Sequence, residues 1–141
     1  MKIGILQTGH VPEELESDHG TYPEMFEALL AGNDFTYESF PVVDGVFPET
    51  IRDADGWLIT GSRHGAYEDH AWIPPLEDLI REIYSSGIPL VGICFGHQIM
   101  AQALGGKVEK FGGIWGVGNV EYTFTDGSKA RLQAMHQDQV V

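Results

Sequence analysis

The chain has 141 residues, of which 43% are hydrophobic and 21% are charged. This length and composition suit one compact globular domain over residues 1–141 and exclude a disordered or collagen-like chain. Eight Lys and Arg residues stand against 21 Asp and Glu residues, and the resulting net charge of −13 excludes nucleic acid and anionic membranes as expected partners.

Three short apolar runs along the chain, each closed by turn residues, have the pattern of buried parallel strands. They are Ile3–Leu6, Trp57–Thr60 and Ile88–Ile93. Lys107–Phe111 and Asn119–Thr125 instead alternate between apolar and polar residues, which predicts the two strands of a hairpin across a glycine-rich turn.

Helical patterns lie between and after the three apolar runs. The first begins with a capping box of Thr21 and Glu24 and ends before Gly32. The second begins at Pro74 and Pro75, carries apolar residues at helical spacing, and ends at Gly87. A third is expected from His97 to Leu104. Because strand and helix alternate, we expect an α/β fold: a three-layer sandwich around a mostly parallel sheet.

The segment Gly92–Gly96 lies between a predicted strand and a predicted helix and matches a nucleophile elbow with Cys94 at its centre. Glycines on both sides of Cys94 permit a strained turn and close approach of the neighbouring backbone. The N-terminus of the following helix favours the thiolate form, which is the nucleophilic form of cysteine. The alternative is a small buried residue at a tight turn, since free cysteines are often simply part of a core.

A loop that contains Gly61 follows the second predicted strand. Its backbone N–H, together with that of Phe95, would make a two-donor oxyanion hole for a carbonyl attacked by Cys94. Taken alone, glycine and serine after a strand form an ordinary turn, so this prediction depends on Cys94.

With these segments in view, the chain resembles the class I (triad) glutamine amidotransferases, and among them the stand-alone domains similar to that of GMP synthase. The segments that carry the resemblance are Gly92–Gln98, Ala101, Ala103–Val108, Ile59–Ser62, Trp115–Gly116 and His136–Val140. The resemblance implies a flavodoxin-like sheet and a Cys94 thiolate that attacks the side-chain amide of glutamine, releases ammonia and leaves a γ-glutamyl thioester for water.

The same resemblance assigns substrate-binding roles. Gln98, Gln137 and Asp138 would help to hold the amino-acid head group of glutamine, and His136 resembles a position near the glutamine pocket. A synthetase or acceptor domain would be the partner that receives the ammonia.

One departure from the family pattern concerns the base. The family places its catalytic histidine and glutamate in a His-x-Glu motif downstream of the segment that contains His136, and no His-x-Glu occurs in this sequence. We therefore expect the C-terminal part of the domain to be missing from the chain. Without a base the elbow lacks the group that activates the thiol and protonates the leaving ammonia.

No metal or cofactor is expected. His64 and His70 lie near Asp69, but their spacing matches no closed zinc pattern. These two histidines are expected in a solvated loop, and His10 and His19 in a polar loop after the first strand. With one cysteine, no disulfide can form within the chain, and no apolar run is long enough for a membrane span or a signal peptide. A cytoplasmic location is therefore expected.

The sequence leaves three functions open. The first is a glutamine amidotransferase-type thiol hydrolase that acts on glutamine or on a γ-glutamyl peptide or conjugate. The second is a binding or regulatory module that keeps the fold and pocket but lacks the triad base. The third is a different thiol enzyme on the same elbow, related to the cysteine peptidases or glyoxalase-like proteins. The residues Gly96, His97 and Gln98 favour the first.

Overall fold

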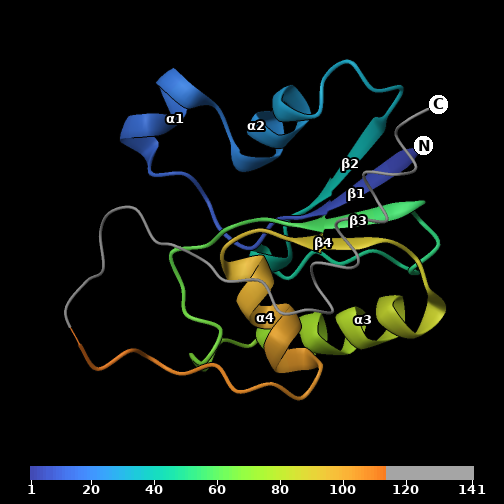
Figure 1. Ribbon diagram of the computed structural model, residues 1–141. Helices are drawn as coiled ribbons and strands as arrows, with labels where there is room; N and C mark the ends of the chain where they lie inside the picture. The colour runs from blue at the N-terminus through green and yellow to red at the C-terminus, as the bar shows by residue number, and fades with distance from the viewer. Residues whose placement is uncertain (114–141) are drawn as a thin grey trace, which may run out of the picture. The chain divides into compact units, whose positions relative to one another are not determined.

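The computed structural model describes residues 1–113, and those up to Phe111 form one compact unit. At its centre lies a parallel sheet of four strands in the order β2–β1–β3–β4 (Figure 1). The strands are β1 (Lys2–Leu6), β2 (Thr36–Phe40), β3 (Gly56–Ile59) and β4 (Leu90–Gly92). This order is that of flavodoxin-like folds, in which ligands bind beyond the carboxyl ends of β1 and β3.

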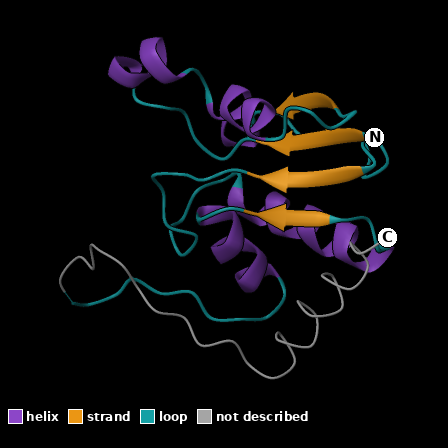
Figure 2. Ribbon diagram, turned by 45° about the horizontal axis from the view of Figure 1, so that its top comes forward, coloured by secondary structure: helices purple, strands orange, loops and turns teal. Residues whose placement is uncertain are grey.

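Helices cover both faces of the sheet. They are α1 (Glu13–His19), α2 (Tyr22–Leu29), α3 (Ile73–Ser86) and α4 (Phe95–Ala103), with a short 3₁₀ helix η1 (Val42–Asp44). In Figures 1 and 2, α1 and α2 lie on one side of the sheet and α3 and α4 on the other. The predicted three-layer α/β architecture is therefore confirmed. Among the helices of residues 1–113, none has the length and apolar character needed to cross a bilayer.

The alternation of side chains along β3 divides the core between the two helical layers. Leu58 packs in a cluster with Ile3 and Ile5, and Phe26 of α2 lies against this cluster. Ile59, the next residue along β3, belongs instead to the larger cluster on the other face, which contains the buried hydrophobic residues of α3 and α4. Both faces of the sheet are therefore apolar, as its parallel strands require.

The predicted helix boundaries have clear physical causes. Thr21 and Glu24 make the expected capping box at the start of α2, with the Glu24 carboxylate 2.7 Å from the Thr21 backbone nitrogen. Helix α3 begins with Pro at its first turn and ends at Gly87, whose φ of 76° is the left-handed conformation that glycine adopts readily.

Some expectations about the elements are wrong. Helix α1 and strand β2 were not expected, and His19 ends α1 instead of lying in a loop. Residues Lys107–Phe111 form no strand, because no described strand pairs with them. Val108 packs against the larger core cluster, whereas Phe111 is 80% exposed, so the predicted alternation has no continuous buried face. The partner predicted for that strand, Asn119–Thr125, lies outside the described residues.

The strand expected over Ile88–Ile93 is shorter and less buried than its apolar sequence suggests. It forms β4 over three residues, and Val91 at its centre is 53% exposed. Within residues 1–113, β4 pairs only with β3, so it lies at an edge of the described sheet.

Candidate functional site

Cys94 lies in the turn between β4 and α4, at the carboxyl edge of the sheet. Its φ and ψ are 54° and −105°, and it is the one non-glycine residue with positive φ in residues 1–113. Residues other than glycine rarely adopt this backbone conformation, because it costs free energy, and those that do are found preferentially at functional sites. Cys94 directly precedes the first turn of α4. The residue is exposed, so solvent and a substrate can reach its sulfur.

The two flanking glycines are required by close backbone approach. A Cβ on Gly96 would lie 2.6 Å from the carbonyl oxygen of Ile59, and one on Gly92 would lie 2.5 Å from the carbonyl oxygen of Gly96. Both separations are shorter than van der Waals contact. The glycine at position 96 is therefore required by packing against β3, and the glycine at position 92 by packing against the first turns of α4.

The structure brings Gly61 next to Cys94. A Cβ placed on Gly61 would lie 3.8 Å from the Cβ of Cys94. Within residues 1–113, the backbone N–H groups of Gly61 and Phe95 donate a hydrogen bond to no protein acceptor. Both N–H groups therefore belong to residues next to Cys94, one in space and one in sequence, and their use as oxyanion donors stays a prediction.

A buried pair of hydroxyl groups supports the Gly61 loop, and no motif in the sequence predicts this pair. Thr8 follows β1 and Thr60 follows β3, and both side chains are fully buried. The Thr8 Oγ1 lies 3.0 Å from the carbonyl oxygen of Thr60, and the Thr8 backbone N–H donates to the Thr60 Oγ1 at 3.0 Å. Because a peptide unit is planar, holding the Thr60 carbonyl also fixes the direction of the Gly61 N–H.

Of the predicted substrate-binding residues, the structure describes one. Gln98 is exposed in the first turn of α4, and its backbone N–H donates to the carbonyl of Cys94 at 3.2 Å. His136, Gln137 and Asp138 lie outside the described residues.

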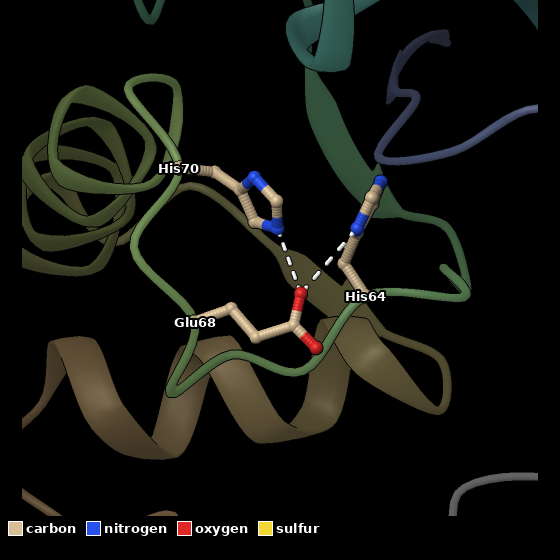
Figure 3. Close-up of side chains that lie close together, drawn as sticks. All are labelled: His64, Glu68 and His70. Atoms are coloured by element: carbon tan, nitrogen blue, oxygen red, sulfur yellow. Dashed lines mark hydrogen bonds and ion pairs between the residues drawn. The ribbon is translucent and has the colours of Figure 1, made fainter.

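Two histidines and a glutamate meet in the loop between β3 and α3 (Figure 3). The Glu68 Oε2 lies 2.7 Å from the His70 Nε2 and 3.5 Å from the His64 Nδ1. Its hydrogen bond with His70 holds the pKa of the Glu68 carboxyl below the ordinary value of 4.5. In the sequence Asp69 lies beside His70 and is the expected carboxylate, but the fold brings Glu68 between the two imidazoles.

A cleft of about 580 Å³ opens at the carboxyl ends of β1 and β3, where this fold class binds ligands. Its walls come from the segment after β1, from η1 and from the loop after Gly61. They are lined by Gly9, His10, Val11, Pro12, Glu13, Glu14, Glu16, Val43, Arg63 and His64. Cys94 does not line this cleft, which shares only the loop of Arg63 and His64 with the surroundings of the elbow.

Comparison with known proteins shows which family the chain is similar to. The model of the family described as glutamine amidotransferase class-I matches residues 30–140. γ-Glutamyl peptidase 4 of Arabidopsis thaliana is 40% identical over 100 residues, which are 70% of this chain and 40% of that protein. The glutamine-hydrolysing GMP synthase of Treponema denticola is 47% identical over 55 residues, which are 39% of this chain and 10% of that enzyme.

A solved structure agrees with the fold. The crystal structure of a glutamine amidotransferase from Thermotoga maritima has a TM-score of 0.56 and 28% identity, and the match covers 73% of this chain and 43% of that one. This chain spans less than half the length of each of these three proteins.

Proposed function

Since the chain belongs to the class I glutamine amidotransferase family, we propose that it is a thiol hydrolase of glutamine or of a γ-glutamyl amide, with Cys94 as its nucleophile. The observation that carries this proposal is the strained backbone of Cys94, held at φ 54° beside Gly61 and in front of α4. A core cysteine has no need of this conformation or of its exposure to solvent.

The proposed reaction proceeds through an acyl-enzyme. The Cys94 thiolate attacks the side-chain amide carbon, and the developing oxyanion accepts hydrogen bonds from the N–H groups of Gly61 and Phe95. The carbon–nitrogen bond then breaks, the amine takes up a proton from water and leaves, and a γ-glutamyl thioester remains. Water attacks the thioester, releasing the γ-carboxylate product and returning the sulfur of Cys94.

The substrate is proposed from two supports. By resemblance to the family, Gln98 and the backbone near Gln137 and Asp138 would hold the glutamine head group, and His136 would lie near its pocket. The γ-glutamyl part would then be the element that the possible substrates share. The name of the Arabidopsis relative favours a γ-glutamyl peptide, whereas that of the Treponema relative favours glutamine and an ammonia-accepting synthetase partner. We propose γ-glutamyl amides as the substrate class. The proposed hydrolase belongs to one domain over residues 1–141, and we propose that it works in the cytoplasm, where a free thiol stays reduced.

A second candidate function, binding without hydrolysis, remains because no catalytic base for Cys94 is identified in the sequence or in residues 1–113. The sequence contains no His-x-Glu, and within residues 1–113 no hydrogen bond joins the Cys94 sulfur to a histidine. A module that binds a γ-glutamyl ligand without turning it over would have the same elbow and the same family membership.

Turnover and binding can be separated in one experiment. Ammonia and free amino acid are measured after mixing the chain with glutamine and with a γ-glutamyl dipeptide, and binding of both is followed by calorimetry. The hydrolase predicts turnover by the parent chain, with a γ-glutamyl thioester on Cys94 that mass spectrometry can detect. It predicts complete loss of turnover and of this thioester in Cys94→Ser. Equal turnover in the variant would contradict the role of Cys94, and binding without turnover in the parent chain would favour the binding module.

A further inference from the structure

Three potential metal ligands converge in the loop between β3 and α3. The His64 Nδ1, one Glu68 oxygen and the His70 Nε2 all lie within 4.8 Å of one another. Figure 3 shows both imidazoles directed at the Glu68 carboxylate from two sides. This set of two imidazoles and one carboxylate serves zinc sites that keep a fourth position for water.

The spacing of these atoms suits a small ion. Metal–nitrogen and metal–oxygen bonds of zinc place neighbouring ligands of a tetrahedron about 3.4 Å apart. The separation between Glu68 and His64 is 3.5 Å, and that between Glu68 and His70 is 2.7 Å. The ligand atoms of His64 and His70 lie no more than 4.8 Å apart, and an ion among the three groups would replace the proton that His70 and Glu68 share.

The loop that carries the ligands is anchored to the rest of the unit. Ala66 is 1% exposed, and its carbonyl accepts a hydrogen bond of 2.8 Å from the side chain of Gln102 in α4. Trp72 is 9% exposed and packs against both imidazoles, with centroid distances of 6.0 Å to His64 and 5.9 Å to His70. Ligands held in this way lose little conformational freedom on binding an ion, which favours binding.

We propose that His64, Glu68 and His70 form a binding site for a divalent transition-metal ion of the zinc type, which ties the two ends of this loop together. The net charge of −13 raises the local concentration of cations around the molecule. Irregular spacing in the sequence conceals the site, because the ligands come from a turn and not from one face of a helix or strand.

The ion would act on the loop that follows Gly61. Trp72 contacts the His70 ring on one side and Phe95 of the elbow on the other, with centroid distances of 5.9 Å and 5.6 Å. The three proposed metal ligands do not include the Cys94 thiol. The inference therefore concerns the stability of the loop and does not depend on the proposed hydrolysis.

The test uses the full chain prepared without a histidine tag, with Zn²⁺ as the ligand. Calorimetric titration should find one ion per chain, and Zn²⁺ should raise the melting temperature. In Glu68→Gln and His70→Ala the affinity should fall at least about tenfold, since even the loss of an outer-shell partner has an effect of that size. The rise in melting temperature should shrink accordingly.

Two variants serve as matched controls. His10→Ala removes another imidazole that pairs with a carboxylate, that of Asp44 at 3.0 Å, and Cys94→Ser removes the exposed thiol. Both should bind Zn²⁺ as the parent chain does. The proposal is overturned if the parent chain binds no Zn²⁺, if Glu68→Gln and His70→Ala bind it unchanged, or if Cys94→Ser loses it.

Discussion

Cys94, the proposed nucleophile, has a backbone conformation that costs free energy. A side chain at φ 54° is disfavoured by about 1–3 kcal/mol, and glycine avoids most of this cost. Because the exposed sulfur contributes little to packing, replacing Cys94 by glycine should lose less packing energy than the relief of the backbone gains.

This cost predicts an unusual rank of stabilities. Cys94→Gly should be more stable than Cys94→Ala by roughly 1 kcal/mol, whereas glycine is ordinarily the less stable of the two. Urea unfolding of the two variants measures the difference, and the alanine variant, which keeps the Cβ, is the matched control. Equal or reversed stabilities would show that the backbone at residue 94 is relaxed.

Thr8 is a positioning residue in the proposed mechanism. Thr8→Val keeps the shape but removes the hydroxyl that lies 3.0 Å from the Thr60 carbonyl oxygen. We expect kcat to fall while KM changes little, and stability to fall by about 1–3 kcal/mol because a buried acceptor loses its partner.

Two further variants separate this effect from general damage. Thr8→Ser retains the hydroxyl and should restore kcat. Thr36→Val makes the same substitution at an exposed position of β2 and should leave kcat unchanged. A Thr8→Val variant with the parent kcat would remove Thr8 from the oxyanion arrangement.

At the scale of elements, the capping box of α2 makes stability depend on pH. The Thr21 backbone, and then its hydroxyl, hold the pKa of the Glu24 carboxyl below its ordinary value of 4.5. Because this pKa is lower in the folded chain than in the unfolded one, the carboxylate stabilises the fold above about pH 4.5, and the contribution is lost as pH falls through the folded-state pKa.

Glu24→Gln should therefore lower the urea midpoint at pH 7, and the difference from the parent chain should shrink as the solution is acidified below pH 4.5. Glu27→Gln removes the same charge from the same helix without touching the capping box and serves as control. A difference for Glu24→Gln that stays constant between pH 7 and strongly acidic solution would exclude the capping carboxylate as its cause.

Elements with a buried face could be predicted from the sequence, and those without one could not. The spacing of Leu76, Ile80 and Ile83 predicts α3, and all three are buried in the core. Helix α1 buries none of its residues, so its sequence has no apolar period. Strand β2 buries only Phe40 and has no alternation to detect.

At the scale of the whole molecule, charge opposes folding. With a net charge of −13, the folded chain repels itself more strongly than the expanded chain does. The melting temperature should therefore rise as NaCl increases from about 10 mM to about 150 mM, over which the screening length falls from about 30 Å to about 8 Å. A melting temperature that falls with salt would mean that attractive ion pairs outweigh the repulsion.

The parts of the site differ in how far the sequence predicts them. Cys94 with its two glycines is a local pattern, and the sequence predicts it directly. The contact of Thr8 with Thr60 joins residues 52 positions apart and depends on β1 lying beside β3. The position of Glu68, and not Asp69, between two imidazoles depends on the conformation of a turn, which the order of residues does not specify.

The link between Thr8 and Thr60 also bears on the order of events during folding. Neither the segment after β1 nor the loop after β3 can orient the Gly61 N–H by itself, because each supplies only one of the two hydroxyl groups. The strands must first have found each other across a long stretch of intervening chain. During refolding, an oriented Gly61 N–H would therefore be regained only after β1 and β3 have paired, and the return of any catalysis that depends on it would report on that pairing.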